Sequence, residues 1–355
     1  MWRRPYAVGP MAEPAVEFRR GDRVESVARA DGAVVDSSGQ LVAWFGDPDR
    51  EAYWRSAAKP LQALEVVLSG AAEQFGLAAE DLALIAGSHS GEAFHAERVA
   101  ALLKRAELGE DALVLAPTWP RRPDAAEARR AAGGGPSRLT HQCSGKHAGM
   151  LLAARARGWP TAGYADPDHP VQRAIRDRVA RWSGLKFGGA LHWAPDGCGV
   201  PTFYGSLRQM AWAYARLGDP RGLEDAEAAA GMVVGEAMRR HPEWVSGTDR
   251  LEVALASVLE HRILAKEGAE ALFCAALPER GLGLAIKIED GNPRAVRPVV
   301  AALLVLLGGL SEDKLRVLTH WAHAERTNPQ GQVVGEIVPV FTLKWTKEWG
   351  INVKP

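Results

Sequence analysis

A serine and a lysine stand three positions apart in the segment Ser56-Ala57-Ala58-Lys59-Pro60. Residues at this spacing lie on one face of a helical turn, so the lysine nitrogen can reach the serine hydroxyl. Because Pro60 has no backbone N–H, the helix should begin no earlier than about Ala58, with Ser56 at its N-terminal mouth. A hydroxyl and a neutral amine placed this way can act as nucleophile and base. Alone, the motif also fits a helix-capping serine beside a solvated lysine.

A lysine acts as a base only when its pKa is lowered. At the reference pKa of about 10.4, only about four lysines in ten thousand are neutral at pH 7. Burial of Lys59 or a second cation nearby would lower this pKa. One candidate cation is Lys287, which shares a face of the predicted strand 282–288 with small residues and so has space around it. The alternative is a solvated lysine on a strand face.

Ser88 lies in the glycine-rich segment 87–91, Gly-Ser-His-Ser-Gly. An apolar run at 82–86, which predicts a buried strand, precedes it, and a predicted helix at 95–108 follows. A nucleophile elbow would occupy this place in an α/β hydrolase, but the order Gly-x-Ser-x-Gly is not kept. Ser88 with Lys287 as its base is therefore one hypothesis, and a simple glycine-rich turn is the other.

Two cysteines offer metal chemistry. Cys143 and Lys146 lie in a segment that also holds His141 and His147, and Cys198 recurs in Asp-Gly-Cys-Gly. A zinc site normally has four ligands, so a histidine or the lysine would have to complete the set. Ligation by lysine requires loss of its proton. Buried structural thiols are the alternative.

Composition excludes several classes of protein. The 355 residues allow about two domains or one large one. The 43 basic and 43 acidic residues cancel, so the basic excess of nucleic-acid-binding proteins is missing. The longest apolar run, at 299–310, is too short to cross a bilayer and predicts a buried helix. With three cysteines and no secretory signal, the chain is expected to be cytoplasmic, with no membrane or nucleic-acid partner.

The order of elements predicts an α+β fold. Strands at both chain ends flank a helical middle, so both ends should share one mainly antiparallel sheet. The expected elements are a meander at 24–45 with turns at 31–32 and 38–39, a helix at 61–68, a surface connection at 120–136 with about one helical turn, a helical region at 150–259, and a hairpin of strands 272–277 and 282–288.

Taken together, the motifs resemble one family, the rhizobial-type (class 3) L-asparaginases. The matching segments follow the family's order over about residues 24–340: 55–62, 88–92, 143–150, 196–201, 241–243, 287–291 and 334–337. Gln142 stands where the family has Asn, and Val338 where it has Arg. The resemblance implies one catalytic domain at 17–342, with the leader 1–16 and the tail 343–355 unassigned.

The resemblance also implies a fold similar to serine β-lactamases and glutaminases, a homodimer, and two Ser-Lys pairs. These pairs match Ser56 with Lys59 and Ser88 with Lys287. It further implies a zinc ion near the catalytic centre, which supports substrate binding and organises the site. Its ligands match Cys143, Lys146 and Cys198.

The implied activity is hydrolysis of L-asparagine to L-aspartate and ammonia through an acyl-enzyme. Ser56 is favoured as the nucleophile because a helix mouth stabilises negative charge. Arg55 and Asp196, each beside a motif residue, are candidates for binding the carboxylate and ammonium of the substrate. The alternatives are a glutaminase or β-lactamase-like amidohydrolase, a cysteine-nucleophile amidase, and a non-catalytic protein that binds zinc or an amino acid.

Overall fold

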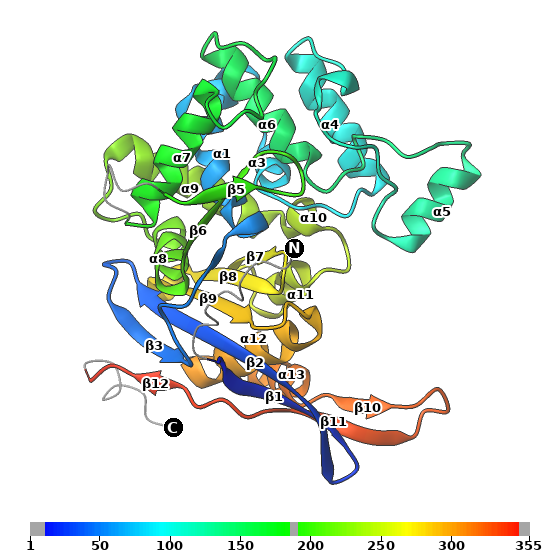
Figure 1. Cartoon of the computed structure of the whole chain (residues 1–355), viewed down its shortest axis with the longest axis vertical. Coiled ribbons are helices and arrows are strands. Elements are labelled where there is room, and N and C mark those ends of the chain that lie inside the picture. Colours follow the sequence, from blue (N-terminus) through cyan, green and yellow to red (C-terminus); the bar gives the residue numbers. More distant parts are fainter. Residues whose placement is uncertain (1–10, 185–190, 348–355) are drawn as a thin grey trace, which may run out of the picture.

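The computed structural model describes residues 11–184 and 191–347, and the first and last strands of this part lie in one large sheet (Figure 1). Within this described part, nine strands form the sheet in the order β10-β11-β1-β2-β9-β8-β7, while β3 pairs with β2 and β12 with β3. All these pairings are antiparallel. The strands are β1 (Glu13–Arg20), β2 (Arg23–Asp36), β3 (Leu41–Phe45), β7 (Leu264–Gly268), β8 (Leu272–Leu277), β9 (Leu282–Ile288), β10 (Glu325–Thr327), β11 (Val333–Pro339) and β12 (Lys344–Trp345).

Helices cover both faces of the sheet. The chain between β3 and β7 supplies most of them, together with a small sheet of β4 (Glu51–Tyr53), β6 (Pro201–Ser206) and β5 (Trp193–Pro195). These helices are α1 (Lys59–Leu68), α2 (Ala71–Gln74), α3 (Ala79–Ile85), α4 (Ala93–Arg105), α5 (Pro123–Ala131), α6 (Ser144–Ala156), α7 (Pro170–Trp182), α8 (Leu207–Gly218), α9 (Asp225–Arg240), α10 (Pro242–Ser246) and α11 (Leu251–Val258). The other face carries α12 (Val296–Leu307) and α13 (Glu312–Ala322), and Leu255 of α11 packs into the same hydrophobic core.

Two hydrophobic cores result from the two-residue period of the strands. In β8, Leu272, Cys274 and Ala276 enter the core under the helical region, whereas Phe273 and Ala275 enter the core under α12. The predicted α+β class with one sheet from both chain ends is therefore confirmed. The hairpin strands and the buried helix near 299–310 are confirmed as well.

Three predicted elements differ from the structure. The turn at 31–32 was wrong: β2 runs straight through it, because the buried Asp31 carboxylate accepts a hydrogen bond from Asp47 N at 2.9 Å and pairs with Arg50. The strand at 82–86 was also wrong, since this apolar run forms most of α3. An apolar run this short does not separate a buried strand from a buried helix turn. The connection at 120–136 holds α5, which is longer than the one turn expected.

In the described residues, no helix is long and apolar enough to span a membrane.

The small residues beside Lys287 have a packing role. A Cβ atom added to Gly283 in β9 would lie 2.0 Å from the carbonyl oxygen of Ala211 and 2.3 Å from Ala215 N, both in α8. These residues therefore bring α8 against the sheet instead of clearing space for a lysine.

We expect Gly283→Ala to lower the free energy of unfolding by about 1 to 3 kcal/mol, because backbone atoms of α8 cannot yield as a side chain does. Urea denaturation would measure this change. Gly135→Ala is the matched control, since its added Cβ meets nothing within 4 Å. Equal stability of the two variants would contradict the tight α8 contact.

Candidate active site

Lys59 is the first residue of α1, and its side chain is buried, with 1% exposed. The 3₁₀ helix η1 (Arg55–Ala58) precedes it and carries Ser56, and Pro60 stands in the first turn of α1, so the predicted helix start is confirmed. Lys59 Nζ donates to Ser88 Oγ at 2.7 Å and to the carbonyl of Gln142 at 3.3 Å. The serine in contact with this amine is thus Ser88.

The environment of Lys59 shifts its amine toward the neutral form. Burial lowers the pKa of Lys59, the sulfur of Cys143 opposes this shift, and the neighbouring ammonium of Lys146 adds to it. The sequence predicts that a second cation near Lys59 would lower its pKa. In the structure, Lys146 is such a cation.

A second buried lysine, Lys266 on β7, comes close to the same site. Its side chain is also 1% exposed, and its Nζ donates to the carbonyl of Glu267 at 2.7 Å. Burial lowers the pKa of Lys266 to about 8, the Glu252 carboxylate at 4.0 Å opposes the shift, and the charge of Lys59 assists it. Lys266 is therefore partly neutral near physiological pH.

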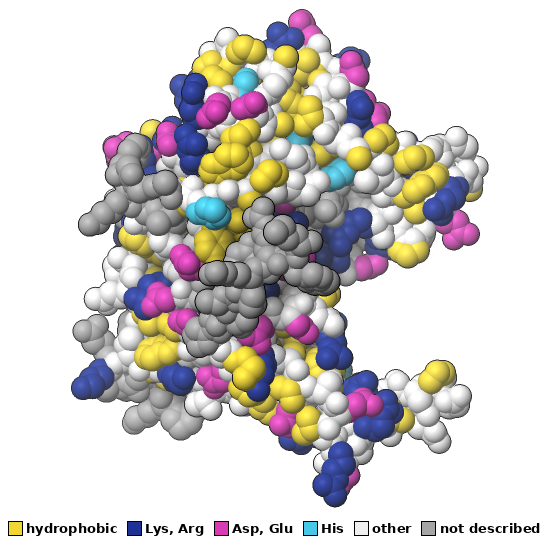
Figure 2. All heavy atoms as spheres, viewed as in Figure 1, with side chains coloured by type: hydrophobic (Ala, Val, Ile, Leu, Met, Phe, Trp, Pro, Cys, Tyr) yellow, Lys and Arg dark blue, Asp and Glu magenta, His cyan; other side chains and the backbone are white. Residues whose placement is uncertain are grey.

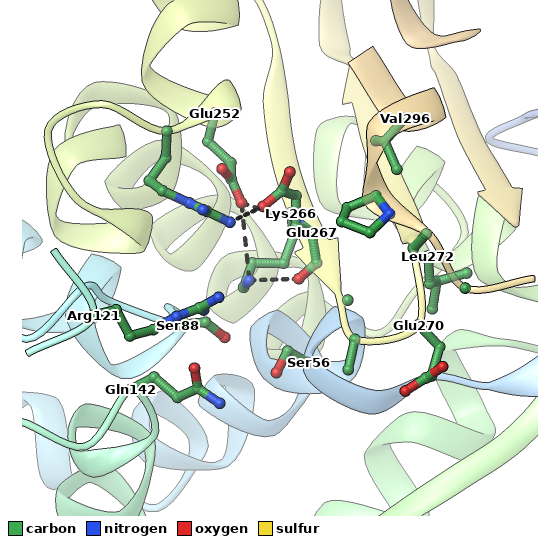
Figure 3. A pocket seen from close by; sticks show the side chains of 16 residues that line it. Ser56, Ser88, Arg121, Gln142, Glu252, Lys266, Glu267, Glu270, Leu272 and Val296 are labelled. Atoms are coloured by element: carbon green, nitrogen blue, oxygen red, sulfur yellow. Dashed lines mark hydrogen bonds and ion pairs between the residues drawn. The ribbon is translucent and has the colours of Figure 1, made fainter. Parts of the chain in front are cut away.

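Ser56, Ser88 and Lys266 open on one cavity of about 330 Å³, which we call the serine cavity (Figure 3). Such a volume lies at the lower end of small-molecule sites. Its other lining residues include Arg121, Gln142, Arg250, Glu252, Glu267, Gly268, Glu270, Leu272 and Val296. Two serine hydroxyls, a partly neutral lysine and several charged groups therefore converge on a space suited to a small polar substrate.

Lys287 does not pair with Ser88. It is not among the residues that line the serine cavity, and its Nζ donates to the carbonyl of Ile288. Burial lowers the pKa of Lys287, and the carboxylates of Glu270 and Asp290 oppose this shift. The predicted Ser88–Lys287 pair is thus replaced in the structure by the contact of Ser88 with Lys59, and the second lysine of the site is Lys266.

Cys143, Lys146 and Cys198, here called the thiol cluster, are buried together behind Lys59. Lys146 Nζ donates to Cys198 Sγ at 2.9 Å. A hydrogen bond from Cys198 holds the pKa of Cys143 well below its usual range, with Lys59 and Lys146 assisting. Burial would lower the pKa of Lys146, but the sulfurs of Cys198 and Cys143 raise it overall.

Arg55 and Asp196 form a pair with each other. Arg55 Nε lies 2.6 Å from Asp196 Oδ1, and Asp196 Oδ2 is 3.6 Å from Cys198 Sγ. Neither residue lines the serine cavity. Their charges cancel beside the thiol cluster, so neither is free for the charged groups of a substrate in this arrangement.

A family model described as L-asparaginase II matches residues 16–339. The chain belongs to the L-asparaginase II family. It is an amidohydrolase of the asparaginase type, and the serine cavity is its candidate active site. No curated protein matches the sequence.

Two solved structures are similar at low identity. A β-lactamase (Mb2281c) from Mycobacterium bovis is 14% identical with a TM-score of 0.38, covering 78% of this chain and 94% of that chain. Mglu in its Tris and glutamate form is 19% identical with a TM-score of 0.35, covering 86% of this chain and 65% of that one. Both TM-scores are below 0.5, so the assignment to the asparaginase family rests on the match of the family model alone.

Sequence reasoning missed Lys266 and the charged residues around it in this asparaginase-type site. The signal was present but weak: Leu264-Ala265-Lys266 places a lysine after two apolar residues, just before the predicted hairpin. Only the register that pairs Lys266 with Cys274 shows that this lysine faces the helical core.

We expect the side-chain amine of Lys266 to titrate near pH 8, below an ordinary lysine, because burial disfavours its charged form. Nitrogen-15 NMR of lysine side chains would measure the midpoint, with the signal assigned through Lys266→Arg. A midpoint near the reference lysine pKa of about 10.4 would overturn this prediction.

Proposed function

We propose that this chain hydrolyses the side-chain amide of L-asparagine to L-aspartate and ammonia through a serine nucleophile and lysine bases. The observation that carries the proposal is the 2.7 Å contact of the buried Lys59 Nζ with Ser88 Oγ, beside a cavity that Ser56 and Lys266 also line. Membership of the asparaginase family supports an amide substrate.

In the proposed reaction, Ser56 Oγ attacks the amide carbon and its proton passes to the neutral amine of Lys59. That proton then goes through Ser88 to the amide nitrogen, the C–N bond breaks and ammonia leaves. Water attacks the acyl ester and a lysine takes its proton. The ester C–O bond then breaks, the lysine returns the proton to Ser56 Oγ, and L-aspartate leaves. Lys266, still largely protonated at neutral pH, supplies positive charge to the developing oxyanion.

Ser56 is assigned as the nucleophile because of its place in η1, directly before α1. The N-terminal end of a helix stabilises negative charge that develops near it. Ser88, which accepts a hydrogen bond from Lys59, is better placed to relay a proton.

The preference for asparagine rests on membership of the asparaginase family. L-Glutamine differs from L-asparagine by one methylene, which is worth about 1 to 3 kcal/mol in a pocket. We therefore propose a preference for asparagine with some turnover of glutamine.

The donor atoms of the thiol cluster fit a zinc ion. Two buried sulfurs and one buried amine converge there, and zinc prefers sulfur and nitrogen ligands. Across residues 11–184 and 191–347, no group of three or more His, Cys, Asp or Glu side chains could hold a metal, so the lysine is needed to complete this set. Cys143, Lys146 and Cys198 would hold the ion, which would supply positive charge behind Lys59. To ligate, Lys146 must lose the proton that the sulfurs now stabilise.

Two further proposals, on oligomeric state and on cellular compartment, rest on the family resemblance and on the composition. We propose a homodimer and a reducing, cytoplasmic setting. The three cysteines of the chain are free and buried, as a reducing compartment allows.

The decisive experiment is ammonia release from L-asparagine and L-glutamine by the purified protein, with zinc measured on the same sample. Asparagine-selective release supports the proposal. Bound zinc without turnover of either amide would contradict it and favour a non-catalytic protein that binds zinc or an amino acid.

We expect Ser56→Ala and Lys59→Met to lower kcat on L-asparagine by at least about a thousandfold, because each removes a group that acts at the reacting atoms. Circular dichroism should show a native fold in both variants. Lys104→Met, which removes an exposed lysine, is the control and should retain full activity. More than about a tenth of the wild-type activity in either active-site variant would reject its assigned role.

We expect Cys198→Ser to lose most of its bound zinc and to raise KM more than it lowers kcat. Metal content by mass spectrometry is the primary measurement. Cys274→Ser is the matched control, because Cys274 is also buried but lies on β8 outside the thiol cluster. Equal zinc in the two variants would remove Cys198 from the ligand set.

A further inference from the structure

The serine cavity is lined by three cations, and two of them are already satisfied. Arg250 forms an ion pair with Glu267. Lys266 donates to the Glu267 carbonyl and lies 4.0 Å from Glu252. The third cation, the guanidinium of Arg121, has neither a hydrogen bond nor an ion pair with any residue in the described part of the chain.

The backbone fixes Arg121 at the edge of the active site. Arg121 N donates to the carbonyl of Ser90 at 2.8 Å, which ties this loop to the segment that carries Ser88. The side chain of Arg121 is exposed and extends toward the serine cavity, which it lines (Figure 3).

The neighbouring arginine shows the contrast. Arg122 pairs with Asp124 and with Asp249, each at 2.5 Å, and does not line the serine cavity. Arg122 is therefore held by carboxylates of the protein, whereas Arg121 faces the active site without an ion-pair partner.

An anion at Arg121 would also relieve a repulsion. Partial burial lowers the pKa of Arg121, and the charge of Arg250 lowers it further. Arg121 also lines a second cavity of about 350 Å³, which it shares with Arg250 but which contains neither Ser56 nor Ser88. Arg121 therefore stands at the boundary of the serine cavity, where the end of a substrate remote from its amide would lie.

We propose that Arg121 binds the α-carboxylate of the amino-acid substrate and makes a free carboxylate a requirement for turnover. A guanidinium matches a carboxylate in shape and can bond both of its oxygens. The role considered from sequence for Arg55 passes to Arg121, because Arg55 is neutralised by Asp196. This inference rests on the proposed amidohydrolase function.

The test compares two substrates that differ only at this group. β-Alaninamide is L-asparagine with hydrogen in place of the α-carboxylate, so it keeps the amine and the reacting amide. In Arg121→Gln we expect KM for L-asparagine to rise about 10- to 150-fold, the usual worth of a hydrogen bond to a charged group, with kcat within about threefold. The preference for asparagine over β-alaninamide in kcat/KM should shrink by the same factor. Arg121→Lys should recover part of the lost affinity, because lysine restores the positive charge but cannot bond both carboxylate oxygens as a guanidinium does.

Arg130→Gln is the charge-matched control, since Arg130 is exposed on α5 and stacks on Trp119. It should leave both parameters unchanged. An unchanged KM in Arg121→Gln, or an equal loss on both substrates, overturns the role of Arg121. If the wild-type protein hydrolyses neither amide, the proposed function fails, and calorimetry with L-aspartate then decides the binding role alone. Binding that Arg121→Gln weakens by the same 10- to 150-fold supports it, and equal binding by both proteins overturns it.

Discussion

The active site depends on the burial of three lysine side chains within one region of the core. Lys59, Lys146 and Lys266 are each at most 3% exposed. Burial disfavours the charged form of an amine, so three such groups cannot all remain ammonium ions without compensation. The structure resolves this in different ways: the cysteine sulfurs keep Lys146 charged, while Lys59 and Lys266 move toward the neutral form that a base requires.

Each lysine comes from a different helix or strand, so segments far apart in the sequence must pack together to build the site. Lys59 begins α1, Lys146 lies in the first turn of α6, and Lys266 lies on β7 at one edge of the sheet. The close approach of α8 to the sheet at Gly283 belongs to the same packing, since α8 contributes to the core beneath these elements. Local flexibility at any one layer would move an amine relative to its hydroxyl.

The sequence alone predicted elements well where one periodicity dominated. The strands 272–277 and 282–288 were predicted to the residue, because β-branched and apolar residues are bounded there by Pro278 and Gly281. Residues 82–86 were misassigned, because five consecutive apolar residues fit both a buried strand and a buried helix turn. Asp31-Gly32 has the residue types of a turn, but the Asp31 carboxylate is satisfied inside the sheet by Asp47 and Arg50.

The choice of Lys287 over Lys266 shows what sequence patterns cannot supply. Strand alternation placed Lys287 on the sheet face that carries Ala285, and the register aligns Ala285 with Cys274 and Cys274 with Lys266. Lys266 and Lys287 therefore share a face, but β8 separates their strands, which lie about 10 Å apart at the usual strand spacing. Face is a property of one strand, whereas distance from Ser56 depends on strand order. A lysine can be assigned to a catalytic serine only when both are known.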